Sequence, residues 1–131
     1  MLQIKTKTDY GLLIMLELAR HPEDFVPLSA IASKIGISSV YLAQLAQSLV
    51  KAGLIKSREG SRGGFCLVKA PNDINLLNII EALEKGPELK CSINGQVCAH
   101  SASCSLPSIW SGVLTELKDV LRKKTLATLL N

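Results

Sequence analysis

The sequence lacks any long apolar run. The longest covers residues 12–16 and is followed at once by Glu17 and then by Arg20. A bilayer span needs about 20 apolar residues. No secretory signal pattern is visible either. We therefore expect a cytoplasmic protein with no membrane segment.

The sequence also lacks the residue combinations of an active site. It shows no acid–base pair and no activated nucleophile, and both histidines, His21 and His100, fall in predicted loops. The 131 residues, 47% of them hydrophobic, suffice for one core and an element for dimerisation. No room is left for a separate catalytic domain, and repeats and low-complexity linkers are absent. We expect neither an enzyme nor a small-molecule substrate.

The first half of the chain has three stretches with the apolar spacing of helices. The first is expected to begin at Thr8 as N-cap, the second to end at Gly36, and the third to begin at Ser38 or Ser39 and end at Gly53. Two helices joined by a short glycine-containing turn are typical of a helix-turn-helix. The apolar positions are Leu12, Leu13, Leu16 and Ala19, then Leu28, Ile31, Ala32 and Ile35, then Val40, Leu42, Leu45, Leu49 and Val50.

A hairpin and two further helices are predicted next. Residues 54–58 and 65–69 resemble strands, and the glycines between them suit a tight tip, so the hairpin forms a wing. Asn72, Asp73 and Asn75 lead into a helix that carries Leu76, Ile79, Ile80 and Leu83 and ends before Gly86 and Pro87. A long helix runs from Pro107 to about Lys124, and one more capped turn is expected in residues 125–131.

The long C-terminal helix has an apolar stripe whose spacing alternates between four and three residues. The stripe consists of Leu106, Trp110, Val113, Leu117 and Val120. This spacing is typical of a coiled-coil seam between two chains. A helix packed on its own domain would have a similar pattern, so the sequence leaves both interpretations open.

The predicted fold is mainly α with a small β-hairpin. It comprises a winged helix-turn-helix core at residues 1–86, a cysteine-bearing loop at 87–105, and a dimerisation helix with a tail at 106–131, all within one integrated domain.

The positive charge of the chain is concentrated on the wing. Residues 51–69 contain five basic residues and one acid, Glu59, so this stretch carries an excess of +4, equal to that of the whole chain. The third helix, by contrast, has no charged residue from Ser38 to Val50. A basic hairpin can follow phosphates, and short polar side chains suit a major groove, although a solvated loop and an ordinary exposed helix face are the alternatives. The residues expected to contact DNA are Ser38, Ser39, Tyr41, Gln44, Gln47, Lys51, Arg58, Ser61, Arg62 and Gly63.

Three of the four cysteines lie close together. Six residues separate Cys91 from Cys98 and five separate Cys98 from Cys104. This crowding indicates a metal site in a reducing compartment, and the long spacing leaves room for an iron-sulfur core. A zinc site completed by His100 and redox-active thiols remain alternatives. Cys66 is expected to be a small buried apolar residue.

The whole sequence resembles the winged-helix regulators of the IscR and NsrR type. The resembling segments are Thr8-Asp9-Tyr10-Gly11, Pro27-Leu28 with Ile31, Gly36-Ile37-Ser38, Tyr41-Leu42-Ala43-Gln44-Leu45, Gly53-Leu54, Arg62-Gly63-Gly64-Phe65, the cysteine loop, and Trp110 at the start of the dimer helix. The resemblance implies a homodimer with crossed C-terminal helices. It also implies recognition helices in successive major grooves of a palindromic operator, and wings at the minor groove.

The resemblance further implies that Cys91, Cys98 and Cys104 hold an iron-sulfur cluster. Pro107 occupies the position at which IscR-type regulators have a histidine ligand, and proline cannot ligate. NsrR-type regulators instead take an aspartate from the other subunit, which matches Asp9, while His100 is the rival fourth ligand. The extra residue between the first two cysteines leaves the cluster type open, with 4Fe-4S favoured and 2Fe-2S as the alternative. Relatives often have arginine at the position of Glu59, so their operator sequence does not transfer to this chain.

The sequence thus predicts a DNA-binding regulator, favoured as a repressor, that senses iron-sulfur status, nitric oxide or redox state through its cluster. The alternatives are a cofactor-free or zinc-bound thiol regulator and, from another class, a small iron-sulfur carrier or electron-transfer protein.

Overall fold

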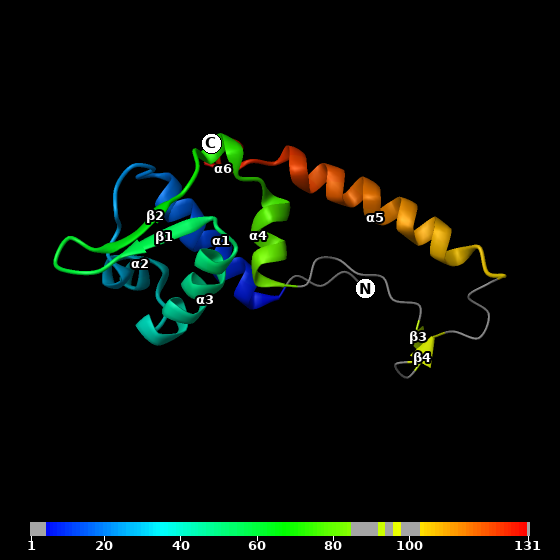
Figure 1. Cartoon of the computed structure of the whole chain (residues 1–131), viewed down its shortest axis with the longest axis horizontal. Coiled ribbons are helices and arrows are strands. Elements are labelled where there is room, and N and C mark those ends of the chain that lie inside the picture. Colours follow the sequence, from blue (N-terminus) through cyan, green and yellow to red (C-terminus); the bar gives the residue numbers. More distant parts are fainter. Residues whose placement is uncertain (1–4, 85–91, 94–95, 98–102, 131) are drawn as a thin grey trace.

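The computed structural model describes residues 5–84, 92–93, 96–97 and 103–130. The elements in chain order are α1 Thr6–Ala19, α2 Leu28–Ile35, α3 Ser39–Lys51, β1 Ile55–Arg58, β2 Gly64–Leu67, the 3₁₀ turn η1 Pro71–Asp73, α4 Leu76–Leu83, β3 Ser92–Ile93, β4 Gln96–Val97, α5 Leu106–Lys123 and α6 Leu126–Leu129 (Figure 1). The mainly helical fold, the hairpin of β1 and β2 and the long C-terminal helix are confirmed. The pair β3 and β4 lies in the stretch for which no regular structure was predicted.

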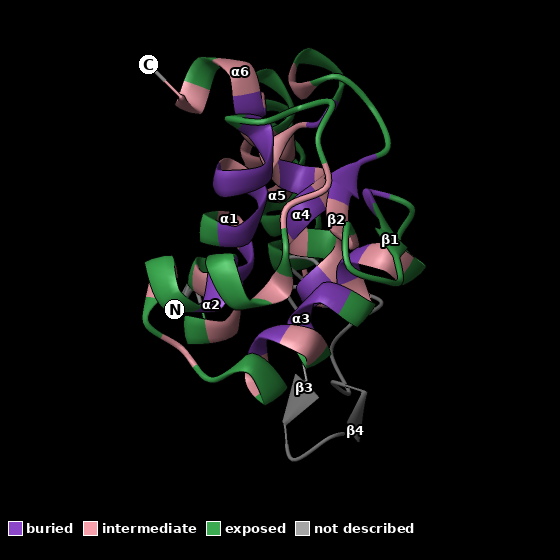
Figure 2. Cartoon of the chain, turned by 90° about the vertical axis from the view of Figure 1, so that its left-hand side faces the viewer, coloured by how far each residue is buried: buried purple, intermediate pink, exposed green. Residues whose placement is uncertain are grey.

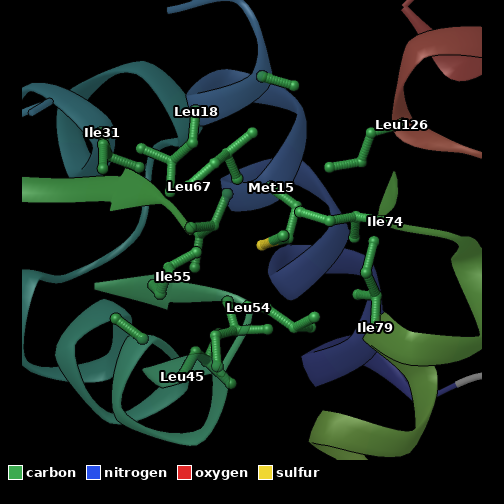
Figure 3. Close-up of a cluster of buried hydrophobic side chains, with 14 of the residues drawn as sticks. Met15, Leu18, Ile31, Leu45, Leu54, Ile55, Leu67, Ile74, Ile79 and Leu126 are labelled. Carbon is green, nitrogen blue, oxygen red and sulfur yellow. The ribbon is translucent and has the colours of Figure 1, made fainter. Parts of the chain in front are cut away.

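Helix α1 occupies the centre of the core. Helices α2, α3, α4 and α6 and strand β2 all contact it. Its side chains Ile14, Met15 and Leu18 are completely buried. Figure 3 shows Met15 and Leu18 among apolar side chains from the hairpin, from Ile74 just after η1, and from α4 and α6. Figure 2 shows the buried residues along α1, α3 and α4.

Three of the four apolar positions predicted for α1 lie in the core or pack against it, and Leu13 is the exception. The predicted core residue Leu13 is 45% exposed, whereas Ile14 and Met15 beside it are fully buried. Residues 12–16 are all apolar, so their spacing alone cannot specify which side faces the core. The orientation is set by the neighbours of α1 instead.

The predicted cap of α1 was also wrong. The N-cap is Lys5, which provides no side-chain cap, and Thr8 is buried inside the first turn. Glu84, just after α4, takes over this function. Its carboxylate oxygen Oε1 accepts a hydrogen bond from the Lys5 backbone N–H at 3.1 Å and another from the Thr8 hydroxyl. The cap therefore comes from a residue far along the chain.

Two local capping boxes hold the end of the chain against the core. Asn75 caps α4 and Thr125 caps α6, each exchanging hydrogen bonds with the residue three positions later. The Leu76 N–H donates to the Lys124 carbonyl at 2.8 Å, and the Leu126 N–H donates to the Ile74 carbonyl at 2.9 Å. The extra turn predicted for the tail is thus confirmed, and α6 returns to the core (Figure 1).

Helix α5 extends away from the core. It contacts α4, but none of its residues is buried (Figure 1). Its stripe residues Leu106, Trp110, Val113 and Val120 are 47–54% exposed, and Leu117 is half-buried. The chain itself therefore covers little of this apolar face. Among the described residues, no single helix has the length and apolar composition of a membrane span.

One charged network ties α1 to α2. Glu17 is only 8% exposed, and its carboxylate lies 2.8 Å from the Lys34 Nζ and 3.2 Å from an Arg20 guanidinium nitrogen. The hydrogen bond from Lys34 holds the pKa of the Glu17 carboxyl below its ordinary value of 4.5. Because folding lowers this pKa, the ionised Glu17 carboxylate stabilises the folded chain at pH values above its ordinary pKa. This contribution is lost as the pH falls through the lower pKa of the folded state.

We expect Glu17→Gln to lower the free energy of unfolding by about 1–2 kcal/mol at pH 7, because the hydrogen bonds to the buried charge are weakened. Urea denaturation at several pH values measures this, and the difference from the unchanged chain should shrink below about pH 4.5. The matched control is Asp119→Asn. Asp119 pairs with Arg122 at 2.7 Å, but both side chains are 54% exposed, so this change should have almost no effect. Equal losses from the two variants would contradict a special contribution from Glu17.

Candidate nucleic-acid interface

Helices α2 and α3 form a sharply bent pair. Their axes bend by 112° across the three residues 36–38, within the range of about 90–120° found in helix-turn-helix units. Gly36 ends α2 in the left-handed conformation, with φ of 81°, and its N–H donates to the Ala32 carbonyl at 2.8 Å. The Ser38 hydroxyl accepts from the Tyr41 N–H at 3.2 Å and caps α3. The predicted stop and one of the two predicted caps are confirmed.

Helix α3 has a buried side and an exposed side. Leu42, Leu45, Ala46 and Leu49 are buried. The predicted contact residues Ser38, Ser39, Gln44, Gln47 and Lys51 are all exposed. Tyr41 is half-buried, with its ring perpendicular to that of Tyr10 and 5.9 Å from it between centroids. The structure thus brings together the helix residues that the sequence assigned to DNA, with Tyr41 at the margin of that surface.

Val40, one of the apolar positions of the predicted third helix, lies at the surface. It is 72% exposed. Its position four residues before Gln44 and seven before Gln47 places it on the exposed side of α3. That spacing was available in the sequence.

The wing is attached to the core through a third extended segment. In the β1–β2 pair, Ile55 is opposite Leu67 and Arg58 is opposite Gly64. Val26, before α2, forms a bridge to Phe65, with reciprocal backbone hydrogen bonds of 2.8 and 2.9 Å. The wing is therefore held against the loop that leads into α2.

Glycine is required at Gly64 for two reasons. Its φ is +142°, which side chains of L residues rarely adopt, and a Cβ there would overlap the Val26 carbonyl oxygen. Gly60 at the tip also has a positive φ, +101°, but a Cβ there would meet open space.

Arg58 braces the wing from within. Its guanidinium stacks 4.0 Å above the Phe25 ring and donates to the Arg62 carbonyl from two nitrogens, at 2.6 and 3.2 Å. The Lys56 ammonium lies 5.7 Å from the same ring. The side chains of Ser61 and Arg62 at the tip are exposed. Arg58 thus holds the backbone of Arg62, whose own charged side chain is exposed to solvent.

The predicted cluster ligands are only partly within the described residues. Cys91, Cys98 and His100 lie outside them. Cys104 is half-buried just before α5, and Asp9 is exposed in the first turn of α1. In the part of the chain that is described, no three potential metal ligands gather. The N-terminal ends of α1 and α5 lie well apart in Figure 1. Cys66 is 4% exposed, as expected for a buried apolar residue.

The fold and the sequence both match known regulators. The family model Rrf2, an iron-dependent transcriptional regulator, matches residues 4–131. The chain belongs to the Rrf2 family.

Three Rrf2-type relatives are similar over nearly the whole chain. The structure of CymR, the global cysteine regulator of Bacillus subtilis, has a TM-score of 0.80 at 35% identity and covers 99% of this chain and 97% of that one. The structure of IscR from T. potens has a TM-score of 0.75 at 38% identity, covering 98% and 86%. The regulator NsrR of Halalkalibacterium halodurans is 33% identical over 132 residues, which cover 98% of this chain and 90% of that protein. The relatives are transcription regulators, and the resemblance to IscR-type and NsrR-type proteins is confirmed.

We expect Gly64→Ala to destabilise this Rrf2-family protein more than Gly60→Ala does. Both positions have a positive φ, which costs about 1 kcal/mol or more for alanine. Only at Gly64 would the added Cβ also overlap the Val26 carbonyl. Gly64→Ala should therefore lower the free energy of unfolding, measured by urea denaturation, by at least ~2 kcal/mol. Equal losses would mean that the Val26 bridge does not restrain the wing.

Proposed function

We propose that this Rrf2-family chain is a transcription repressor that binds a palindromic DNA operator as a homodimer and senses iron-sulfur status, nitric oxide or redox state through an iron-sulfur cluster. The observation that carries the DNA-binding part is the combination of an exposed, uncharged face on α3 with a braced, basic wing. Lys51 lies at the end of that face, and Arg62 at the tip of the wing.

The two surfaces suit different parts of a duplex. Serine and glutamine side chains form hydrogen bonds with base edges and phosphates in the major groove, and glutamine pairs with adenine through two bonds. Arg62, with its backbone held by Arg58, suits a phosphate or a narrow minor groove. Ser61 is exposed at the tip, while Gly63 is half-buried where a Cβ would overlap the Arg58 carbonyl oxygen, so Gly63 would shape the tip that meets the duplex. A carrier or electron-transfer protein would need neither surface.

The homodimer part rests on α5. Its exposed apolar stripe has the spacing of a seam, and the chain leaves that stripe largely uncovered. A second copy of α5 would bury it. Two copies would then present two recognition helices, as a palindromic operator requires.

The cluster part rests on the chemistry of the donors. Thiolates of Cys91, Cys98 and Cys104 suit iron, and a carboxylate or imidazole can complete the set. We infer that Asp9 of the other subunit is the fourth ligand, with His100 as rival, because α1 and α5 begin far apart within one chain (Figure 1). When bound, such a cluster would react with nitric oxide or oxygen, and its presence would depend on the supply of iron. Loss of an Asp9 ligand would release α1 of one subunit from the cysteine segment of its partner.

The DNA interface can be tested through Arg62. We expect Arg62→Ala to weaken binding to an operator selected from random sequences and to reduce the salt-dependence slope by about one for each wing, because one phosphate contact is lost. Fluorescence anisotropy at several salt concentrations measures both. Arg122→Ala, which removes an exposed arginine of α5, serves as the control. An unchanged slope for Arg62→Ala would contradict the assignment of the wing.

The cluster can be tested by composition. Anaerobically purified protein should be brown, with about four iron and four sulfide per chain, and Asp9→Ala should lose its cluster faster in air while remaining folded. Asp24→Ala, another exposed aspartate outside the proposed donor set, is the control. About two iron and two sulfide would favour a 2Fe-2S cluster and His100 as ligand.

A thiol-based or zinc-bound regulator is the second candidate function. It is considered because CymR, a relative with the same fold, is described as a regulator of cysteine and not of iron or iron-sulfur clusters. A colourless protein with zinc or no metal, even after anaerobic reconstitution with iron and sulfide, would replace the cluster proposal with this one. The DNA-binding proposal would be unaffected.

A further inference from the structure

We propose that Val40 is a specificity-determining residue that contacts the C5-methyl group of a thymine in the major groove. This inference rests on the proposed DNA-binding function and adds to it the chemistry of one base pair in each half-site.

Val40 is unusually placed for a valine. At 72%, it is the most exposed large apolar side chain among the described residues, although it belongs to a helix that contributes four buried side chains to the core. It is the second residue of α3. The N-terminal residues of a recognition helix are the ones that contact base edges. The Ser38 cap fixes this first turn, so the position of Val40 is well defined.

The neighbours of Val40 favour a base as its partner. Val40, Gln44 and Gln47 follow one another at intervals of four and three residues, so they form a row along one side of α3. All three are exposed, and the next position of that row is Lys51. The row therefore presents two methyl groups, then two amides, then one positive charge. A protein partner would normally cover a larger apolar patch, but the exposed residues of α3 that precede Val40 and follow it by one turn are the polar Ser39 and Gln44.

Thymine matches this row better than the other bases do. It alone presents a methyl group in the major groove, and apolar side chains discriminate it by contact with that group. Four residues of helix advance about 6 Å, whereas base pairs are about 3.4 Å apart. Gln44 would then reach a base pair one or two steps from the thymine, where its amide can pair with an adenine. We expect A·T pairs at these positions of each half-site.

The test uses operators selected from a random pool with the full-length protein. Each thymine is replaced in turn by deoxyuridine, which lacks only the C5-methyl, and binding is measured by fluorescence anisotropy. At one thymine of each half-site, the replacement should weaken binding about fourfold, which is the effect of losing one buried methyl group. With Val40→Ala, the same replacement should have a clearly smaller effect, because both γ-methyl groups are gone and only the Cβ methyl remains.

Val68→Ala is the matched control. Val68 is another exposed valine, at 48%, but lies outside α3, so this variant should keep the fourfold effect of deoxyuridine. Circular dichroism confirms that Val40→Ala remains folded. If deoxyuridine has the same effect at every thymine for both the unchanged protein and Val40→Ala, the inference is wrong although DNA binding stands. If no sequence is enriched or bound, the proposed function itself fails.

Discussion

The burial of α1 is the constraint on which the rest of the structure depends. Because α2, α3, α4, α6 and β2 all pack on this one helix, it sets their positions relative to one another. Ile14, Met15 and Leu18 are fully buried at the places where these elements meet. Helix α3 and the wing are thus supported by the same core. Their relative geometry cannot change without repacking α1, because a close-packed interior resists continuous deformation.

The wing adds a second level of restraint. Hairpins of two strands are marginally stable on their own, and this one gains backbone hydrogen bonds from Val26 and a side-chain brace from Arg58 on Phe25. Both Val26 and Phe25 belong to the loop that enters α2. The loop therefore connects the helix-turn-helix to the wing directly. This arrangement holds two chemically different surfaces, one neutral and one basic, in a fixed relation.

Local signals in the sequence predicted the parts of this fold that depend on local chemistry. Gly36 and Ser38 set the end of α2 and the start of α3 through their own backbone and side-chain preferences, and both are confirmed. The sequence could not predict features that depend on distant residues. The cap of α1 comes from Glu84, and the face that α1 buries depends on its neighbours, because residues 12–16 are apolar throughout. Val40 has the apolar character of the core residues of α3, but its helical spacing to Gln44 and Gln47 puts it on the exposed side. The exposed polar side of α3 was predictable, because its residues recur at helical spacing and lack charge from Ser38 to Val50.

In the proposed dimer, the same partner subunit both completes the cluster site and buries the apolar stripe of α5. Within a single chain, the start of α1, which carries Asp9, lies well apart from the start of α5, which follows Cys104 (Figure 1). The same chain leaves the apolar stripe of α5 uncovered. A partner subunit would resolve both features together, by covering the stripe and by bringing its own α1 to the cysteine segment. The cluster would then link α1 of one subunit to α5 of the other. Because α1 fixes α3 and the wing, losing that link would alter the spacing of the two DNA-binding surfaces without unfolding either core.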